Sequence, residues 1–143
     1  AVFHPAGSLG RRLKSVTEIM RPLSVLRQAR ASESVREVFV STPVAGRRSG
    51  AVLLLDEDGT LAGLFTDSDL ARLMEQRRDE SLDRPIREVM TTRPVTLPTS
   101  AMFSDVVAIL SERKISEIPV VDQSGAPVGM IDITDVIGWL PTQ

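Results

Sequence analysis

Two polar residues one helical turn apart are the part of this sequence best suited to hold a ligand. Thr66 and Asp69 follow the apolar run Leu61–Phe65 and open a segment with helical apolar spacing. At such a strand-to-helix junction a threonine hydroxyl, free backbone N–H groups and the positive helix end can face an anion. Asp69 can accept two hydrogen bonds from a ribose diol, and Gly63 lets a ligand approach the strand backbone. The same spacing also fits a capping box that only stabilises the helix.

The pattern Gly-x-x-Thr-x-x-Asp recurs near the C-terminus with a different charge. It reads Gly129, Asp132 and Asp135, so an aspartate replaces the threonine. Asp132 can still cap a helix, but it puts a negative charge at the position that faces an anion in the first copy. Glu117, just before the preceding strand, adds another, and like charges repel more strongly as a cleft loses water.

Both motifs belong to a chain that repeats itself. Met20 and Met90 end matching segments 70 residues apart, and residues 56–69 recur as residues 122–135, 66 residues further on. Self-similarity of this kind marks two copies of one structural unit. Each copy is shorter than an ordinary domain, so we expect the two to fold together.

Each copy predicts the element order β-α-β-β-α, opened by a short helical turn. Turns of the form Asp-x-x-Gly join apolar runs into two hairpins. The hairpins are Ala51–Leu55 with Leu61–Phe65, and Ile118–Val121 with Val128–Ile131. The strands expected before them are Ser24–Leu26 and Pro94–Leu97. The apolar stripes of the closing helices are Leu70, Leu73 and Met74 in the first copy and Val136, Trp139 and Leu140 in the second.

Composition excludes several kinds of site. The 143 residues include no cysteine and a single histidine, His4, which removes disulfides, cysteine–metal sites, thiol catalysis and any histidine cluster. Seventeen basic and nineteen acidic residues give a net charge of −2, without the basic footprint that nucleic acid or an anionic membrane attracts. No apolar run approaches the ~20 residues of a membrane span. We expect a soluble, cytoplasmic protein with no metal and no cofactor.

The motifs, in register in both copies, resemble those of the cystathionine-β-synthase (CBS) domain. The segments that carry the resemblance are Gly63–Leu70 and Ile118–Ile131, and two CBS domains in tandem resemble a Bateman module. The resemblance implies an α+β fold in which two CBS repeats, related by pseudo-two-fold symmetry, pack through their sheets. It also implies pairing of the modules into dimers.

The resemblance implies roles for individual residues as well. In that family the Gly-x-x-Thr-x-x-Asp motif holds the phosphate and ribose of a nucleotide, which gives Thr66 and Asp69 those roles. Each cleft also takes residues from the loop that enters the first strand of the other copy. The implied set is Met90, Arg93 and Val95 beside Thr66, with Ser49, Gly50 and Ala51 at the cleft edge. We expect this cleft to bind a nucleotide. We expect the cleft of Asp132, Asp135 and Glu117 to be weak, empty, or selective for a neutral nucleoside or a cation.

Residues Phe3–Leu13 belong to neither repeat. They resemble the His-Pro-Gly-Gly-x-Leu-Gly-Arg-x-Leu segment that ends the sugar-isomerase (SIS) domain of arabinose-5-phosphate isomerases, with Ala6 in place of a glycine. A CBS pair follows that segment in those proteins. The resemblance makes His4 the counterpart of an active-site histidine, and we expect no isomerase turnover from these residues alone. The implied division is 1–13 as SIS tail and linker, 14–76 as CBS repeat 1, 77–84 as linker and 85–140 as CBS repeat 2.

The resulting hypothesis is a regulatory, nucleotide-sensing CBS pair attached to a sugar-phosphate isomerase. The parent enzyme would interconvert ribulose 5-phosphate and arabinose 5-phosphate for synthesis of the capsule and lipopolysaccharide sugar Kdo. The expected ligand is an adenine nucleotide, CMP or CMP-Kdo, and the expected assembly is a homodimer within a tetrameric parent. Two alternatives remain: a structural oligomerisation module with vestigial clefts, and a free-standing CBS pair that regulates another protein.

Overall fold

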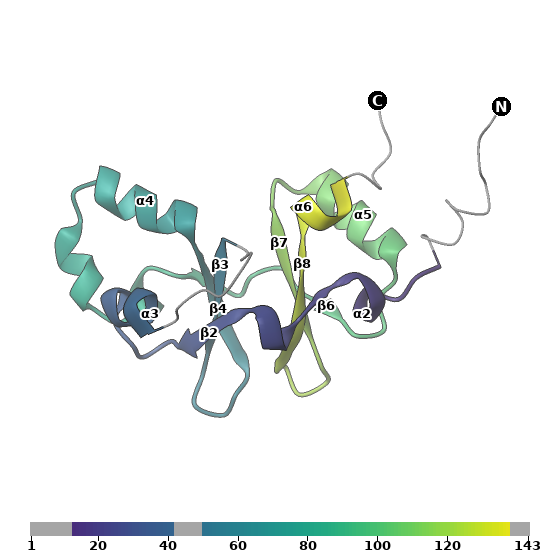
Figure 1. The fold of residues 1–143 in the computed structure, drawn as a ribbon, viewed down its shortest axis with the longest axis horizontal. Coiled ribbons are helices and arrows are strands. Elements are labelled where there is room, and N and C mark those ends of the chain that lie inside the picture. The colour runs from purple at the N-terminus through teal and green to yellow at the C-terminus, as the bar shows by residue number, and fades with distance from the viewer. Residues whose placement is uncertain (1–12, 42–49, 138–143) are drawn as a thin grey trace.

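The computed structural model describes residues 13–41 and 50–137, which form two four-stranded sheets between two groups of helices (Figure 1). Across the first sheet the strands are β2 (Arg27–Arg30), β3 (Ala51–Leu55), β4 (Leu61–Thr66) and β5 (Thr91–Thr92). Across the second they are β6 (Leu97–Pro98), β7 (Glu117–Val121), β8 (Pro127–Asp132) and β1 (Arg21–Pro22). The matching strand orders confirm the expected α+β fold of two similar repeats.

Helices cover the outer face of each sheet. The first sheet carries α3 (Val35–Ser41) and α4 (Asp67–Glu75), and the second carries α2 (Val16–Ile19), α5 (Phe103–Glu112) and α6 (Ile133–Val136) (Figure 1). Short 3₁₀ turns span Leu23–Val25, Asp79–Asp83 and Ile86–Glu88. No helix in the part of the chain that the structure describes is long and apolar enough to cross a membrane.

Both predicted hairpins are confirmed, and their central strands are buried on both faces. Gly59 and Gly125 take the left-handed φ values of 87° and 91° that their tight turns require. In β3, Val52 and Leu54 face the helices, whereas Leu53 faces the other sheet. This double burial explains why the strand is a continuous apolar run rather than an alternating one.

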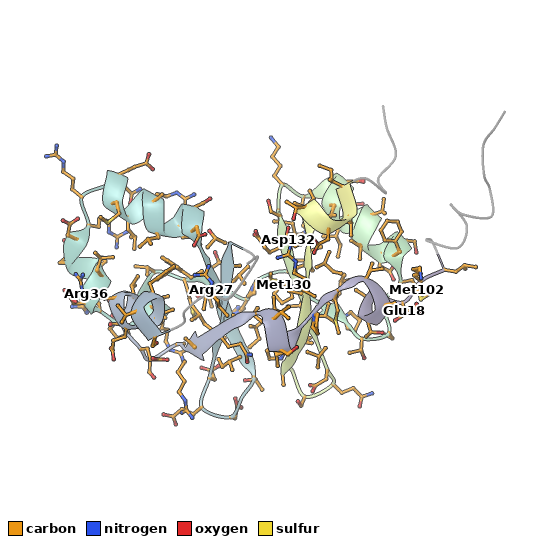
Figure 2. All side chains as sticks on the ribbon, in the orientation of Figure 1. Glu18, Arg27, Arg36, Met102, Met130 and Asp132 are labelled. Carbon is orange, nitrogen blue, oxygen red and sulfur yellow. The ribbon has the colours of Figure 1, made fainter. Side chains whose placement is uncertain are left out.

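The two sheets meet through a small apolar layer. Leu53 and Leu64 of the first sheet pack against Met130 of the second, and Leu23 and Leu26 close the layer from one side. Met130 is fully buried, and Figure 2 shows it between the two sheets. The repeats therefore form one unit, as their short length predicts.

The opening segment of each repeat joins the sheet of the other repeat. The Val16 N–H donates to the Ala101 carbonyl at 2.8 Å, and β1 pairs with β8. In the same way the Ile86 N–H donates to the Glu33 carbonyl at 2.7 Å, and β5 pairs with β4. Val16 and Ile86 are fully buried in the core of the opposite repeat. Each sheet with its core is therefore built from most of one repeat and the opening segment of the other.

Glycines make room for the exchanged segments. A Cβ atom on Gly63 would lie 2.5 Å from Met90 Sδ and 2.6 Å from the Thr91 carbonyl oxygen, and one on Gly129 would meet Met20 and the Arg21 carbonyl. The expectation that Gly63 leaves its backbone open to a ligand is therefore wrong, because Met90 occupies the space above it.

Three local predictions differ from the structure. Ser24–Leu26 is not a strand, because Leu23 and Leu26 turn inward through a 3₁₀ turn and the strand begins at Arg27. Of Pro94–Leu97, only Leu97 belongs to a strand, since the chain before it is shaped by Arg93 in the left-handed region. Met74 is half-exposed, whereas Leu70 and Leu73 pack on the sheet as predicted.

The structure also adds detail to residues 77–84. They hold the 3₁₀ turn Asp79–Asp83, whose Ser81 is buried, and Leu82 packs against the first core. His4, Ser49, Trp139 and Leu140 lie outside the described residues.

The close packing of Met90 and Thr91 on Gly63 predicts that a single added methyl group at this glycine destabilises the protein. We expect Gly63→Ala to lower the free energy of unfolding by about 1–3 kcal/mol, since the Thr91 carbonyl belongs to the backbone and cannot turn away. Urea unfolding measures the change. Gly50→Ala is the matched control, since its Cβ would lie 3.6 Å from Asp67 Oδ2 in ordinary contact. Equal stability of the two variants would contradict the packing of Met90 on Gly63.

Candidate functional site

A pocket opens between the two repeats at the end of the first sheet. Its volume is about 440 Å³, within the range of small-molecule sites. Five residues that the resemblance implies for this cleft line it together, namely Gly50, Thr66, Asp69, Arg93 and Val95. The first repeat thus contributes the start of α4, and the second contributes the loop after β5.

Thr66 and Asp69 form a complete capping box at the start of α4. The Asp69 N–H donates to Thr66 Oγ1 at 3.1 Å, and the Thr66 N–H donates to Asp69 Oδ2 at 2.9 Å. Arg72 Nη1 donates to the other carboxylate oxygen of Asp69 at 3.0 Å. The Thr66 hydroxyl keeps its own proton to donate, and each Asp69 oxygen keeps acceptor capacity. The box therefore stabilises the helix and also holds both groups in place at the pocket.

Three other predicted residues lie behind the pocket rather than in its lining. Ala51 is buried in the layer between the sheets, and Met90 belongs to the first core. Gly63 lies beneath Met90. These residues position the pocket wall, and Ser49 lies outside the described residues.

A buried arginine behind the pocket was not found by sequence reasoning. Arg27, the first residue of β2, is 8% exposed; its Nη2 donates to Asp67 Oδ1 at 3.2 Å, and its guanidinium lies 5.4 Å from the centre of the Phe39 ring. Asp67 is the first residue of α4, so the pair ties the start of that helix to the first sheet. The sequence carried little signal for it, because Arg27 opens an edge strand whose other residues are only partly buried or exposed.

The loop at the pocket mouth is held in an unusual conformation. Arg93 has a φ of 52°, in the left-handed region that favours glycine, and it precedes Pro94. A non-glycine residue held there costs about 1–3 kcal/mol, and such strain clusters at ligand-binding sites. The Arg93 side chain is exposed where it borders the pocket.

The second motif is neutralised from within the protein. Arg21 Nε and Nη2 donate to the two oxygens of Asp135 at 2.6 and 2.9 Å, and Nη1 lies 3.7 Å from Asp132 Oδ2. Asp132 in turn caps α6 by accepting from the Thr134 N–H at 2.9 Å, and Figure 2 shows it where β8 ends. The hydrogen bond to Asp135, followed by the charge of Asp132, raises the pKa of Arg21 despite the opposing effect of burial.

Arg21 and Thr91 hold matching positions in the two repeats. Arg21 pairs with Met130 on β8, and Thr91 pairs with Leu64 on β4. The exchanged segment thus brings a cation to the acidic motif and a neutral threonine to the Thr66 motif. Sequence reasoning missed Arg21 because the pairing spans more than a hundred residues.

The sequence predicts that Glu117 lies beside the second motif, and the structure places it between the second motif and the pocket of Thr66. Its Cα pairs with that of Asp132 across β7 and β8, yet Glu117 lines the pocket of Thr66. Burial, and then the charges of Asp132, Asp69 and Asp67, raise the pKa of Glu117 above its ordinary value. Residues 13–41 and 50–137 contain no cluster of three or more carboxylate or histidine side chains suited to a metal ion.

Known structures share this architecture. Residues 86–142 match the family model of the CBS domain. CBSX2 of Arabidopsis thaliana, solved in complex with AMP, is 25% identical and superposes with a TM-score of 0.70 over 87% of this chain and 94% of that chain. The chain folds as a CBS domain pair. The CBS pair of protein MJ0100, solved with 5′-methylthioadenosine and S-adenosyl-L-methionine, superposes with a TM-score of 0.69 over 87% of this chain and 98% of that chain at 23% identity.

Curated relatives of this CBS domain pair are larger proteins. Arabinose 5-phosphate isomerase GutQ of Salmonella typhimurium is 35% identical over 133 residues, which cover 92% of this chain and 40% of the relative. Arabinose 5-phosphate isomerase KdsD of Pseudomonas aeruginosa is 33% identical over 145 residues, covering 96% of this chain and 41% of the relative. The chain is homologous to the C-terminal region of these proteins and spans about 40% of their length. The resemblance drawn from the motifs is confirmed.

The internal salt bridge of the second motif predicts a stability effect. We expect Arg21→Met, which keeps the aliphatic stem, to lower the free energy of unfolding by about 1–3 kcal/mol, because it leaves the buried Asp132 and its neighbour Asp135 without a counter-charge. Chemical denaturation measures the loss.

Arg36→Met is the matched control for this variant. Arg36 donates to Asp83 at 2.8 Å, but the two side chains are 56% and 68% exposed, against 15% and 7% for Arg21 and Asp132. An ion pair exposed to this extent is screened by solvent and contributes little to stability. If both variants lose equally little, Arg21 does not neutralise the second motif.

Proposed function

We propose that this CBS domain pair binds an adenine nucleotide in the pocket of Thr66 and Asp69 and thereby regulates an attached sugar-phosphate isomerase. The observation that carries the proposal is the pocket itself, in which a helix N-terminus, a hydroxyl and a carboxylate meet beside residues of the other repeat. AMP is the ligand of CBSX2, and 5′-methylthioadenosine and S-adenosyl-L-methionine are the ligands of MJ0100.

Each part of a nucleotide has a suitable partner in the pocket. The N-terminal N–H groups of α4 and the Thr66 hydroxyl suit a phosphate, and the exposed cations Arg93 and Lys114 stand at the same pocket. Asp69 suits the ribose diol. The apolar side chains of Leu64, Val95 and Ile115 suit the face of a base.

Regulation would follow from the position of the pocket between the repeats. A ligand that contacts Thr66 on one side and Arg93 on the other stabilises one relative placement of the two sheets. Binding energy that differs between two such placements is the origin of allosteric coupling, typically about 1–3 kcal/mol. The attached domain would be an arabinose-5-phosphate isomerase whose product enters Kdo synthesis, with residues 1–13 as its end and the repeats at 14–76 and 85–140.

The second motif would stay empty. Its acidic pair already holds the Arg21 guanidinium, so a phosphate would have to displace an ion pair and meet two carboxylates. One pocket per chain is the consequence. A homodimer within a tetrameric parent remains the expected assembly.

Loss of the motif is predicted to abolish binding. We expect AMP to raise the melting temperature of the wild type, and neither Thr66→Ala nor Asp69→Ala to respond to AMP, because the phosphate and ribose lose their partners. Thr66→Ser, which keeps the hydroxyl, should respond. Thermal shift with AMP, ATP, CMP and CMP-Kdo measures the effect and identifies the preferred nucleotide.

Both alanine variants also lose a helix cap, which costs about 0.5–2 kcal/mol. Ser15→Ala is the matched control, because Ser15 and Glu18 form the capping box of α2, which packs against the core of the second repeat. It should lower the melting temperature yet keep the full response to AMP. A wild type that responds to none of the four nucleotides would overturn the proposal and favour the structural oligomerisation module.

Stoichiometry tests the second motif separately. We expect isothermal titration calorimetry to find one AMP per chain. The double variant Arg21→Thr with Asp132→Thr, which copies the residues at the matching positions Thr91 and Thr66, should bind a second AMP with lower affinity. Two AMP per wild-type chain would contradict the role assigned to Arg21.

A further inference from the structure

Three charged side chains that line the pocket have no partner within the described residues. Asp67 and Asp69 form ion pairs with Arg27 and Arg72. Among residues 13–41 and 50–137, the side chains of Glu117, Arg93 and Lys114 form no hydrogen bond or ion pair. The other two carboxylates of the pocket are thus neutralised by arginines in contact with them, whereas Glu117 has no such counter-charge among the described residues.

Three neighbouring carboxylates act on Glu117 through their charge. It is the half-buried first residue of β7, beside Asp132 on β8, and the start of α4 brings Asp67 and Asp69 toward it. The cations at the same pocket are exposed to solvent, which weakens their effect on a half-buried carboxylate. The charged groups that face Glu117 come from three places. Asp132 on β8 has Arg21 on β1 as its partner, and Asp67 and Asp69 on α4 have Arg27 and Arg72 as theirs. Arg93 and Lys114 lie in the adjacent loops.

We propose that Glu117 takes up a proton when a phosphorylated ligand binds in this pocket, so that the site reads nucleotide and proton together. The proposal rests on nucleotide binding at Thr66 and Asp69. A phosphate adds negative charge to a space that already holds three carboxylates, and the neutral carboxyl removes one of them. The proton comes from solvent and stays on a carboxyl oxygen of Glu117.

The direction of the pH dependence follows from these charges. Burial and the acidic neighbours already raise the pKa of Glu117, and a bound phosphate raises it further. The complex therefore holds more protons than the free protein in the pH range above the ordinary titration of glutamate. Affinity for a nucleotide must then fall as pH rises through that range, whereas a neutral nucleoside lacks the charge that drives the effect. Glu117 thus sets how strongly the pocket prefers a nucleotide over its nucleoside.

The test compares AMP and adenosine binding to the wild type and to Glu117→Gln by calorimetry between about pH 5 and pH 8.5. The AMP phosphate titrates near pH 6 itself, but that contribution is common to both proteins and cancels in the comparison. We expect the wild-type affinity for AMP to fall with pH by about tenfold more than that of the variant, as for two unit charges roughly 12 Å apart at an effective dielectric constant of about 20. Adenosine should show no such difference.

Direct proton counting and a matched variant complete the test. Titration in buffers of different ionisation enthalpy should show greater proton uptake on AMP binding by the wild type than by Glu117→Gln. Glu112→Gln, the same change on the exposed last residue of α5, should behave as the wild type. Coincident pH profiles of the wild type and Glu117→Gln, with AMP still bound, would overturn this proposal alone. Absence of AMP binding at every pH would overturn it together with the proposed function.

Discussion

The exchange of opening segments between the two repeats is the constraint on which the rest of this structure depends. Met90 packs against Gly63 and Met20 against Gly129, and in both places a side chain on the glycine would collide with backbone as well as sulfur. Each apolar core is therefore completed by residues from the other repeat, with Ile86 in one and Val16 in the other. Neither core is complete without the other repeat, so we expect the pair to fold as one unit.

The same exchange decides the chemistry at the end of each sheet. Because β5 pairs with β4, the loop with Arg93 lies beside Thr66 and closes a pocket from both repeats. Because β1 pairs with β8, Arg21 lies against Asp132 and Asp135. The two matching motifs thus have different electrostatic environments, because the matching position of the exchanged segment holds Thr91 beside the first motif and Arg21 beside the second. Pseudo-symmetry of the backbone is kept, while symmetry of the sites is broken by charge.

Sequence patterns predicted the elements well wherever interactions between residues close in the chain determine the local structure. The hairpin turns with Gly59 and Gly125, and the capping box of Thr66 and Asp69, lie where spacing and turn chemistry placed them. The failures occur where a distant partner decides. The segment Leu23–Val25 forms a 3₁₀ turn because Leu23 packs into the apolar layer between the sheets. Gly63 is covered because Met90, 27 positions further along the chain, packs against it.

The sequence by itself determined the duplicated β-α-β-β-α order, the relation to CBS domains and the two matching motifs with their different charges, because these depend on residue types within a few positions of each other. Only the tertiary structure decided which residues meet across the repeats: Arg21 with Asp135, Arg27 with Asp67, and Glu117 with the pocket of Thr66 rather than with the second motif alone. The physical reason is that charge interactions depend on distance and burial. Both are set here by strand pairings between segments far apart in the chain.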